Sequence, residues 1–241
     1  MKQGAEGFNP EVQDEFVSTN RISLWGEISA KRAVIWAKIL MGAGELCDDD
    51  LCVDFGGNDG FVSESWGEVT HRPMTVLDPL ETRVKVAEAR GLPVIRATLE
   101  DIPLLDGAAS WGFCSHTLEH TFDLDRAFSE LSRVVSQGLF VVIPLETDRA
   151  REKNPSHNWN NPNPTWWLNK ARSAGFHIWR FDTNWDEDLE GGEVLAILLK
   201  PEAELRWSIK VKRVQNLGSE ASEPIHRAYR IQAAQEGAGT P

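Results

Sequence analysis

The sequence predicts an α/β fold built around a mostly parallel β-sheet. From residue 50 onwards, short apolar runs alternate with amphipathic segments, which is the pattern of successive βαβ units. Further along, the apolar runs 176–182 and 193–200 are separated only by TNWDEDLEGG, an acidic stretch of ten residues. A loop of that length can join an antiparallel pair, whereas a parallel pair needs a crossover of about a dozen residues or more. We therefore expect the sheet to end in a hairpin.

The individual elements follow in a regular order. Residues 28–41 predict a helix, because apolar side chains recur there at roughly the helical spacing. The stretch 165–176 predicts a second helix that ends at Gly175, the residue type that most often terminates helices. Between these two, we expect strands at 51–56, 75–78, 93–98, 110–115 and 139–144, with helices around 60–66, 80–90 and 123–136.

A chain of 241 residues is long enough for one α/β domain with extensions. We expect the domain at 50–200, a helical extension at 1–49 and a C-terminal extension at 201–241. In the last of these, 206–214 alternates apolar and basic residues like an edge strand, and 225–235 suits a short helix. From 205 to 241 there are six Lys or Arg against three Glu, which makes the tail the only locally basic region.

Composition and charge exclude several classes of protein. A formal net charge of -12 disfavours nucleic-acid binding, which depends on Lys and Arg neutralising phosphates. No stretch has the roughly 18 to 20 consecutive apolar residues of a membrane helix, and the first residues do not resemble a signal peptide. We therefore expect a cytoplasmic protein with no membrane partner. Cys47, Cys52 and Cys114 form no CxxC pair, so reduced thiols are expected.

The segment VDFGGNDG at 53–60 is the clearest binding motif. Gly56, Gly57 and Gly60 surround a tight turn at the end of a predicted strand, where glycine lets the main chain lie directly against a ligand. The spacing does not fit GxGxxG, the dinucleotide fingerprint. The chain also has no Gly-Lys pair, so it has no Walker A loop. A turn without a ligand is the alternative interpretation.

This segment resembles the DxGxGxG loop of class I S-adenosylmethionine-dependent methyltransferases. Asp54, Gly56 and Gly60 match the pattern, and Asn58, which tolerates the left-handed conformation, stands in place of the middle glycine. The resemblance covers about residues 50–200. It implies S-adenosylmethionine as cofactor and a Rossmann-like three-layer αβα sandwich, with a mostly parallel seven-stranded sheet in the order 3-2-1-4-5-7-6 and an antiparallel terminal hairpin.

Further cofactor contacts are implied by the same resemblance. Asp78 ends a short apolar strand, at the place where the family binds the cofactor ribose. Thr98 and Leu99 align with residues that hold the adenine, but Thr98 departs from the usual acid, which leaves open whether Glu100 or Asp101 makes that contact. The expected cofactor-binding residues are Asp54, Gly56, Gly57, Asn58, Gly60, Asp78, Pro79, Thr98, Leu99, Glu100 and Ser115.

The segment HTLEH at 116–120 matches HxxEH, a zinc metalloprotease motif that binds its ion from one face of a helix. Here the segment directly follows a predicted strand, so we expect a strand-to-helix loop. The family commonly carries Leu-Glu-His at this place, which accounts for Glu119 and His120 without a metal. We expect no metal site.

His116, His120 and His157 are the candidate catalytic bases, since each is predicted near the cofactor end of the sheet and imidazole titrates near neutral pH. A hydrogen-bonding or packing role is the alternative for each. The segment 153–167 is rich in Asn, Pro and Trp, which suits a loop that contacts the acceptor. Trp166 and Trp167 would equally serve to anchor the helix that follows.

Together these features predict a methyltransferase that acts on a small or glycan-like acceptor by O- or N-methylation. Two alternatives remain: a methyltransferase-like protein without turnover, and a protein or RNA methyltransferase that docks through the basic tail. CSHT at 114–117 is not an NPPY-like motif, which disfavours base or glutamine N-methylation. The acceptor and the oligomeric state do not follow from the sequence.

Overall fold

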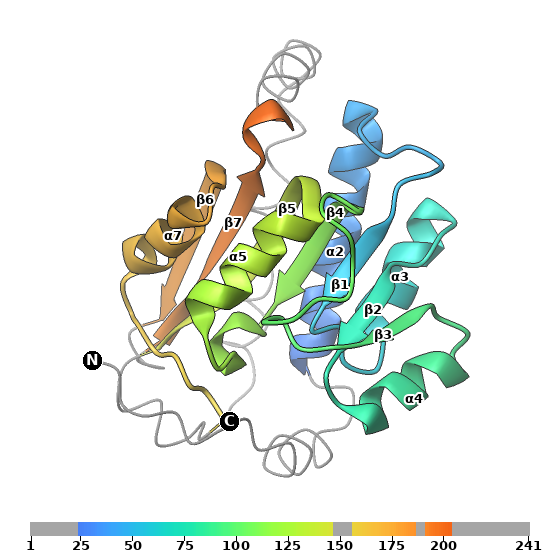
Figure 1. Cartoon of the computed structure of the whole chain (residues 1–241), viewed down its shortest axis with the longest axis horizontal. Helices are drawn as coiled ribbons and strands as arrows, with labels where there is room; N and C mark the ends of the chain where they lie inside the picture. The colour runs from blue at the N-terminus through green and yellow to red at the C-terminus, as the bar shows by residue number, and fades with distance from the viewer. Residues whose placement is uncertain (1–23, 147–155, 187–190, 204–241) are drawn as a thin grey trace, which may run out of the picture.

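The computed structural model describes residues 24–146, 156–186 and 191–203. Within these residues one sheet of seven strands has the order β3-β2-β1-β4-β5-β7-β6, with β7 antiparallel to both neighbours and the other pairs parallel (Figure 1). The predicted fold class, strand order and hairpin are confirmed. The strands are β1 (Cys52–Phe55), β2 (Thr75–Asp78), β3 (Val94–Arg96), β4 (Ala109–Ser115), β5 (Val135–Glu146), β6 (His177–Asp186) and β7 (Gly191–Leu199).

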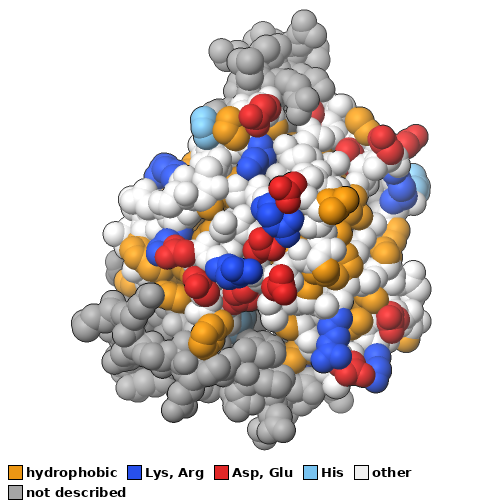
Figure 2. Space-filling view, viewed as in Figure 1, with side chains coloured by type: hydrophobic (Ala, Val, Ile, Leu, Met, Phe, Trp, Pro, Cys, Tyr) orange, Lys and Arg blue, Asp and Glu red, His pale blue; other side chains and the backbone are white. Residues whose placement is uncertain are grey.

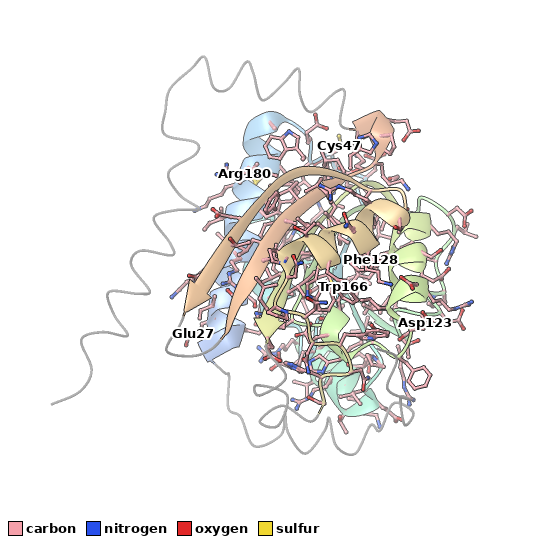
Figure 3. The ribbon with its side chains drawn as sticks, turned by 90° about the vertical axis from the view of Figure 1, so that its left-hand side faces the viewer. Glu27, Cys47, Asp123, Phe128, Trp166 and Arg180 are labelled. Carbon is pink, nitrogen blue, oxygen red and sulfur yellow. The ribbon has the colours of Figure 1, made fainter. Side chains whose placement is uncertain are left out.

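Helices cover both faces of the sheet. In Figure 3, α2 lies on one side, and α5 and α7 lie on the other together with the labelled Phe128 and Trp166. Helix α3 packs beside α2. The helices are α2 (Leu24–Ala43), α3 (Phe61–Thr70), α4 (Glu81–Ala89), α5 (Leu124–Val134) and α7 (Pro164–Ser173), with a short 3₁₀ helix η1 (Leu118–His120).

The central strands are mostly apolar because both of their faces are buried. In β7, Val194, Ala196 and Leu198 point to the core under α5 and α7. The intervening Leu195 and Ile197 point to the core under α2 and α3. Alternation with a period of two thus divides one apolar run between two cores.

Helix α2 is fixed to the sheet by aromatic packing. The Trp36 ring is 1% exposed and lies 5.8 Å from Trp111 on β4 and 5.7 Å from Phe140 on β5, centroid to centroid. Such pairs add to the free energy of burying the rings themselves. The helix predicted at 28–41 is therefore an integral part of the described body.

The structure corrects several predicted boundaries. Helix α2 begins four residues before 28, and α3 continues four residues beyond 66. The helix predicted to reach residue 136 ends at Val134 and passes directly into β5, so this strand begins four residues earlier than 139. The predicted acidic loop is shorter, because 183–186 belong to β6 and 191–192 to β7, where backbone pairing continues. The predicted elements at 206–214 and 225–235 lie outside the described residues.

Charges of both signs are interleaved on the face shown in Figure 2. Arg133 on α5 contacts Glu130 and Asp106, and Lys170 on α7 contacts Asp125. Among the described helices, none is long and apolar enough to cross a membrane.

Replacing Trp36 with alanine should lower the free energy of unfolding by about 3–5 kcal/mol, since it removes a fully buried ring. Urea denaturation followed by circular dichroism measures this change. Met41→Ala is the matched control on the same helix, because Met41 is 46% exposed. Equal losses in the two variants would contradict the packing of α2 described above.

Candidate functional site

The glycine loop lies at the carboxyl edge of the sheet and is fastened to β2. The backbone N–H groups of Gly56 and Gly57 donate to the Leu77 carbonyl, at 2.7 and 3.2 Å. The N–H of Asn58 donates to Asp78 Oδ2 at 3.0 Å. Because β1 pairs with both β2 and β4, these bonds hold the loop where three strand ends meet.

The loop needs residues that accept a positive φ. Gly56, Asn58 and Gly60 have φ values of 77°, 53° and 82°. Asparagine adopts this region more readily than most residues, which explains how Asn58 replaces a glycine. The structure confirms that Asn58 lies in the left-handed region.

The turn after β4 closes directly on the loop. A Cβ atom on Gly56 would lie 2.2 Å from Thr117 Cγ2, and one on Gly57 would lie 2.8 Å from Asp54 Oδ2. Side chains at these two positions would collide with their neighbours. Glycine is thus required at position 56 by close approach and by its positive φ, and at position 57 by close approach.

Two carboxyl groups are buried below the loop. Burial raises the pKa of Asp54 to about 7, opposed by a hydrogen bond that its Oδ2 accepts from the Ser63 hydroxyl at 3.1 Å. Burial likewise raises the pKa of Asp78, although its oxygens accept backbone N–H groups from Leu80 and Asn58. Each Asp78 oxygen accepts one of these bonds, and a carboxylate oxygen can accept two. Asp78 therefore keeps acceptor capacity for a ligand.

The segment after β3 lies at the same edge. The Ala97 N–H donates to the Asp78 carbonyl at 3.3 Å, and Leu99 is buried. Glu100 Oε1 accepts the N–H groups of Phe122 and Asp123 at 2.6 and 3.3 Å. The Glu100 carboxylate thus already supports the start of α5.

Helix α2 also reaches this edge. The Ser29 and Ser115 hydroxyl oxygens are 2.9 Å apart, which links the helix to the end of β4. Pro79 directly follows Asp78 and is partly exposed, and its carbonyl accepts from Arg96 Nε at 3.4 Å. The expected cofactor residues therefore gather along one edge.

His116 begins the turn after β4 and contacts the buried ion pair between Glu193 and Arg32. It has φ 52°, and its Nε2 lies 2.8 Å from Glu193 Oε1. Arg32 of α2 donates to both oxygens of Glu193. Although burial alone would raise the pKa of Glu193, the His116 ring and the Arg32 guanidinium lower it to about 2. The residue stays ionised inside the protein.

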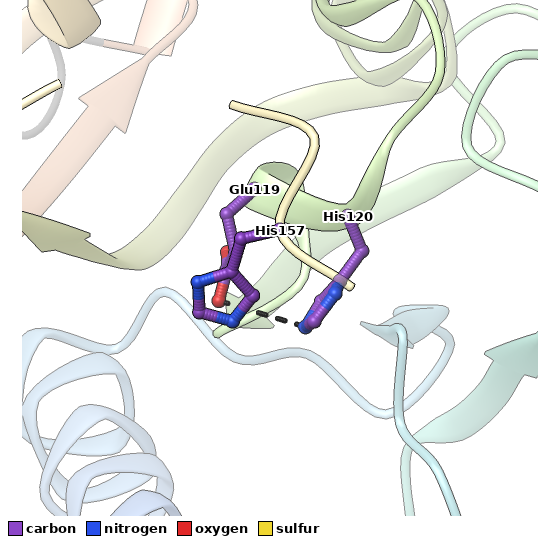
Figure 4. A group of neighbouring side chains, drawn as sticks. All are labelled: Glu119, His120 and His157. Atoms are coloured by element: carbon purple, nitrogen blue, oxygen red, sulfur yellow. Dashed lines mark ion pairs between the residues drawn. The ribbon is translucent and has the colours of Figure 1, made fainter. Parts of the chain in front are cut away.

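The other two candidate bases lie against Glu119 (Figure 4). The His120 and His157 rings meet edge to face, with their centroids 4.7 Å apart. Desolvation lowers the pKa of His120. Desolvation is also the largest single effect on His157, but the hydrogen bond to Glu146 and the negative charges of Glu119 and Glu146 together outweigh it and raise the pKa. The structure therefore brings all three predicted histidines to one place, since His116 Nδ1 is 3.7 Å from Glu119 Oε1.

The HTLEH segment is not an α-helix. Its last three residues form η1, which confirms the predicted loop between β4 and α5. The segment therefore lacks the α-helical setting of the protease motif.

The tryptophans near residue 160 stabilise the segment that carries His157. Trp159 Nε1 donates to the Thr121 carbonyl at 2.7 Å, and Trp167 Nε1 donates to the Asn161 carbonyl at 3.0 Å. Trp167 is fully buried, which supports the anchoring role for this residue. The Trp166 ring contacts both of these rings, with its centroid 6.3 Å from that of Trp159 and 5.0 Å from that of Trp167.

Sequence reasoning missed Arg32, Glu146 and Glu193. Arg32 is a cation within an apolar helical stripe, and Glu193 is an acid at the start of an apolar strand. Arg32 and Glu193 are thus polar residues within predicted apolar elements, which is the signal that would have identified them. Glu146 lies beyond the strand predicted at 139–144, so it gave no such signal. The partners of Arg32 and Glu193 could not be inferred, because the ion pair joins residues 161 positions apart.

Residues 53–143 match the family model described as a methyltransferase domain. The chain carries a class I S-adenosylmethionine-dependent methyltransferase domain. The match begins in β1 and ends in β5, so it contains the glycine loop, Asp78 and the turn after β4. None of the curated proteins matches this methyltransferase in sequence.

Solved structures share its fold. Geranyl diphosphate C-methyltransferase from Streptomyces coelicolor A3(2), in complex with Mg²⁺, geranyl diphosphate and S-adenosylhomocysteine, has a TM-score of 0.59 and 13% identity over 68% of this chain and 79% of its own. A Galdieria sulphuraria protein, provisionally assigned as a sarcosine dimethylglycine methyltransferase, has a TM-score of 0.60 and 12% identity, over 70% and 85%. An S-adenosylmethionine-dependent methyltransferase from Thermotoga maritima has a TM-score of 0.51 and 18% identity, over 79% and 97%. At these identities the likeness concerns the fold.

The residues at the loop fit S-adenosylmethionine, which carries a positive sulfonium and an amino group. Asp54 and Asp78 place two buried carboxyl groups below the loop, and Asp78 has unused acceptor positions. Asn58 Oδ1 is buried without a hydrogen-bond partner among the described residues. Buried polar atoms are normally paired, so this orphan acceptor suits a donor group on a ligand.

Gly56→Ala should lower the free energy of unfolding by at least about 1–2 kcal/mol, because alanine is strained at φ 77° and its Cβ meets Thr117. It should also weaken S-adenosylhomocysteine binding about tenfold or more, measured by calorimetry. Gly42→Ala in α2 is the control: no atom lies within 4 Å of its added Cβ, and stability should rise by up to about 1 kcal/mol. Unchanged cofactor affinity in Gly56→Ala would contradict this account of the loop.

Proposed function

We propose that this methyltransferase transfers a methyl group from S-adenosylmethionine to an oxygen or nitrogen of a small-molecule or glycan-like acceptor. The observation that carries the proposal is that the turn 116–120 contacts both the glycine loop and the cluster of histidines around Glu119. Thr117 packs on the cofactor loop, while His116 and His120 of the same turn lie beside Glu119. The turn that packs on the glycine loop thus also carries imidazole groups that can accept a proton from the acceptor.

The donor side of the proposal uses the carboxyl ends of β1, β2, β3 and β4. Asp78 would bind the ribose hydroxyls with its spare acceptor positions. The main chain of Leu99 would contact the adenine. Of the two acids left open, Glu100 already accepts two backbone N–H groups, which favours the exposed Asp101.

The remaining cofactor residues would line the same surface. The backbone of Gly56, Gly57 and Gly60 would face the cofactor without side chains in the way, and the Asp54 carboxyl group would lie beneath them. Asn58 would contribute its orphan oxygen. Pro79, Thr98 and Ser115 would border the site.

When bound, S-adenosylmethionine supplies a methyl group already activated by its sulfonium, so alignment of the acceptor is the main task of the protein. Imidazole can take up the proton that an oxygen or nitrogen acceptor loses on methylation. The His116 and His120 side chains are 23% and 25% exposed, which leaves them accessible from outside. His157 is more enclosed, at 10%.

A small acceptor is supported by charge. The net charge of -12 and the interleaved charges of the described face give a polyanion no continuous basic surface there. The geranyl diphosphate C-methyltransferase, whose fold is similar, was solved with a small molecule bound, which supports a small acceptor for this fold. A macromolecular acceptor that docks through residues 205–230 is the competing proposal, and it rests on sequence alone.

Calorimetry of the full chain with S-adenosylmethionine, S-adenosylhomocysteine and NADH tests the donor assignment. We expect both sulfur compounds to bind and NADH not to bind. Asp78→Ala should weaken S-adenosylhomocysteine about tenfold or more, the effect of losing hydrogen bonds to a charged group. Glu81→Gln is the control, since Glu81 is exposed on the next helix and pairs with Lys85 and Arg96. Binding of NADH alone would overturn the proposal.

A further inference from the structure

Glu119 carries a buried carboxylate that the fold leaves unsatisfied. Its side chain is 0% exposed, and within the described residues neither Oε1 nor Oε2 has a hydrogen-bond partner. Two histidine nitrogens, His116 Nδ1 and His120 Nε2, lie 3.7 and 3.9 Å from Glu119 Oε1, beyond hydrogen-bond distance. An ionised carboxylate in such surroundings is costly unless it is paired or coordinates a metal.

The two histidines beside Glu119 are oriented as metal ligands commonly are. His120 Nδ1 lies 3.0 Å from the Ser156 carbonyl oxygen, which can only accept, so Nδ1 carries the hydrogen. His157 Nδ1 lies 2.7 Å from Glu146 Oε2. A hydrogen bond of this kind at one ring nitrogen fixes the tautomer and leaves the other nitrogen, Nε2, with a free lone pair.

The backbone holds these side chains in place before any ligand arrives. The N–H groups of Asn158 and Trp159 both donate to the Glu119 carbonyl, at 2.8 and 3.0 Å. Asn158 Nδ2 donates to the His120 carbonyl at 2.9 Å. These bonds tie the segment after His157 to η1, so the three donor groups are brought together by rigid local structure.

We propose that Glu119, His120 and His157 bind a divalent transition-metal ion, with Zn²⁺ as the best match. One potential ligand atom from each residue lies within 4.8 Å of the others (Figure 4). Zn²⁺ binds such atoms at about 2.0–2.2 Å, so a small inward movement would complete the site. Two imidazoles and one carboxylate suit Zn²⁺ better than Mg²⁺ or Ca²⁺, which prefer oxygen.

This inference replaces the expectation that the chain has no metal site. That expectation assumed that His116 and His120 would have to share one helix face, as in HxxEH. The structure instead pairs His120 with His157 from a distant segment, and η1 supplies Glu119. No spacing in the sequence indicates this combination.

The site would hold the acceptor. Three protein ligands would leave a tetrahedral ion one open position, which an acceptor oxygen could occupy. Glu119 and His120 lie in the turn whose Thr117 packs on Gly56, so an acceptor bound there would lie beside the cofactor loop. This role rests on the proposed methyl transfer, whereas the metal site itself does not.

The test uses full-length protein freed of metal by a chelator and then titrated with Zn²⁺ in competition with a chromophoric chelator. We expect one equivalent to bind and the midpoint of thermal unfolding to rise with Zn²⁺ concentration. Glu119→Gln should bind Zn²⁺ at least about a hundredfold more weakly and should show no such rise. His177→Asn, an exposed histidine on β6, is the matched control and should bind as wild type does.

Glu119→Gln also separates a metal site from an ion pair. If Glu119 is an unpaired charge awaiting an ion, the metal-free variant should be at least as stable as the metal-free wild type. If protonated His157 neutralises Glu119 instead, the variant should be less stable, and the proposal is overturned. Zn²⁺ binding that is absent from the wild type, or equal in Glu119→Gln, would also overturn it.

Binding of S-adenosylhomocysteine, measured on the same samples, keeps the two proposals distinct. We expect Glu119→Gln to retain it, because Glu119 is not among the proposed cofactor contacts. Zn²⁺ binding without S-adenosylhomocysteine binding in the wild type would support the metal site and remove its proposed role toward the acceptor.

Discussion

The site depends on the hydrogen bonds that fasten the glycine loop to the end of β2. The Leu77 carbonyl accepts hydrogen bonds from two N–H groups of the loop, and the Asp78 carboxyl accepts a third, so the chain turns sharply where β1 ends. A side chain at Gly56 has no room, because Thr117 packs against that position. The positions of Asp54, Asp78 and the turn after β4 all follow from this one constraint.

The two buried cores give this edge its rigidity. Alternating side chains of β5 and β7 fill both, while α2 is held by Trp36 on one face and α5 and α7 pack on the other. The same packing carries Arg32 and Glu193 to His116, although the first comes from the described N-terminal helix and the second from the last strand. The polar groups of the site are therefore supported by elements from both ends of the described chain.

Sequence reasoning was most successful where the information is local. The loop at 53–60 and the strand ending at Asp78 were predicted because their residues are contiguous, and the terminal hairpin because its loop is short. The three histidines were placed at the correct edge, since each follows a strand end. Their mutual arrangement was not predictable, because it depends on backbone bonds from Asn158 and Trp159 to Glu119 and on antiparallel pairing of β7 with β5. Long-range contacts of this kind leave no periodic signal.

Amide hydrogen exchange of the full chain, with and without S-adenosylhomocysteine, tests most directly where the cofactor binds. Protection should increase at 54–60, at 75–80 and at 97–101, the three segments that meet at the carboxyl edge. The amides of α5 should change little, because this helix supplies none of the proposed cofactor contacts. Protection that is confined to other segments, or no change at 54–60, would contradict the account.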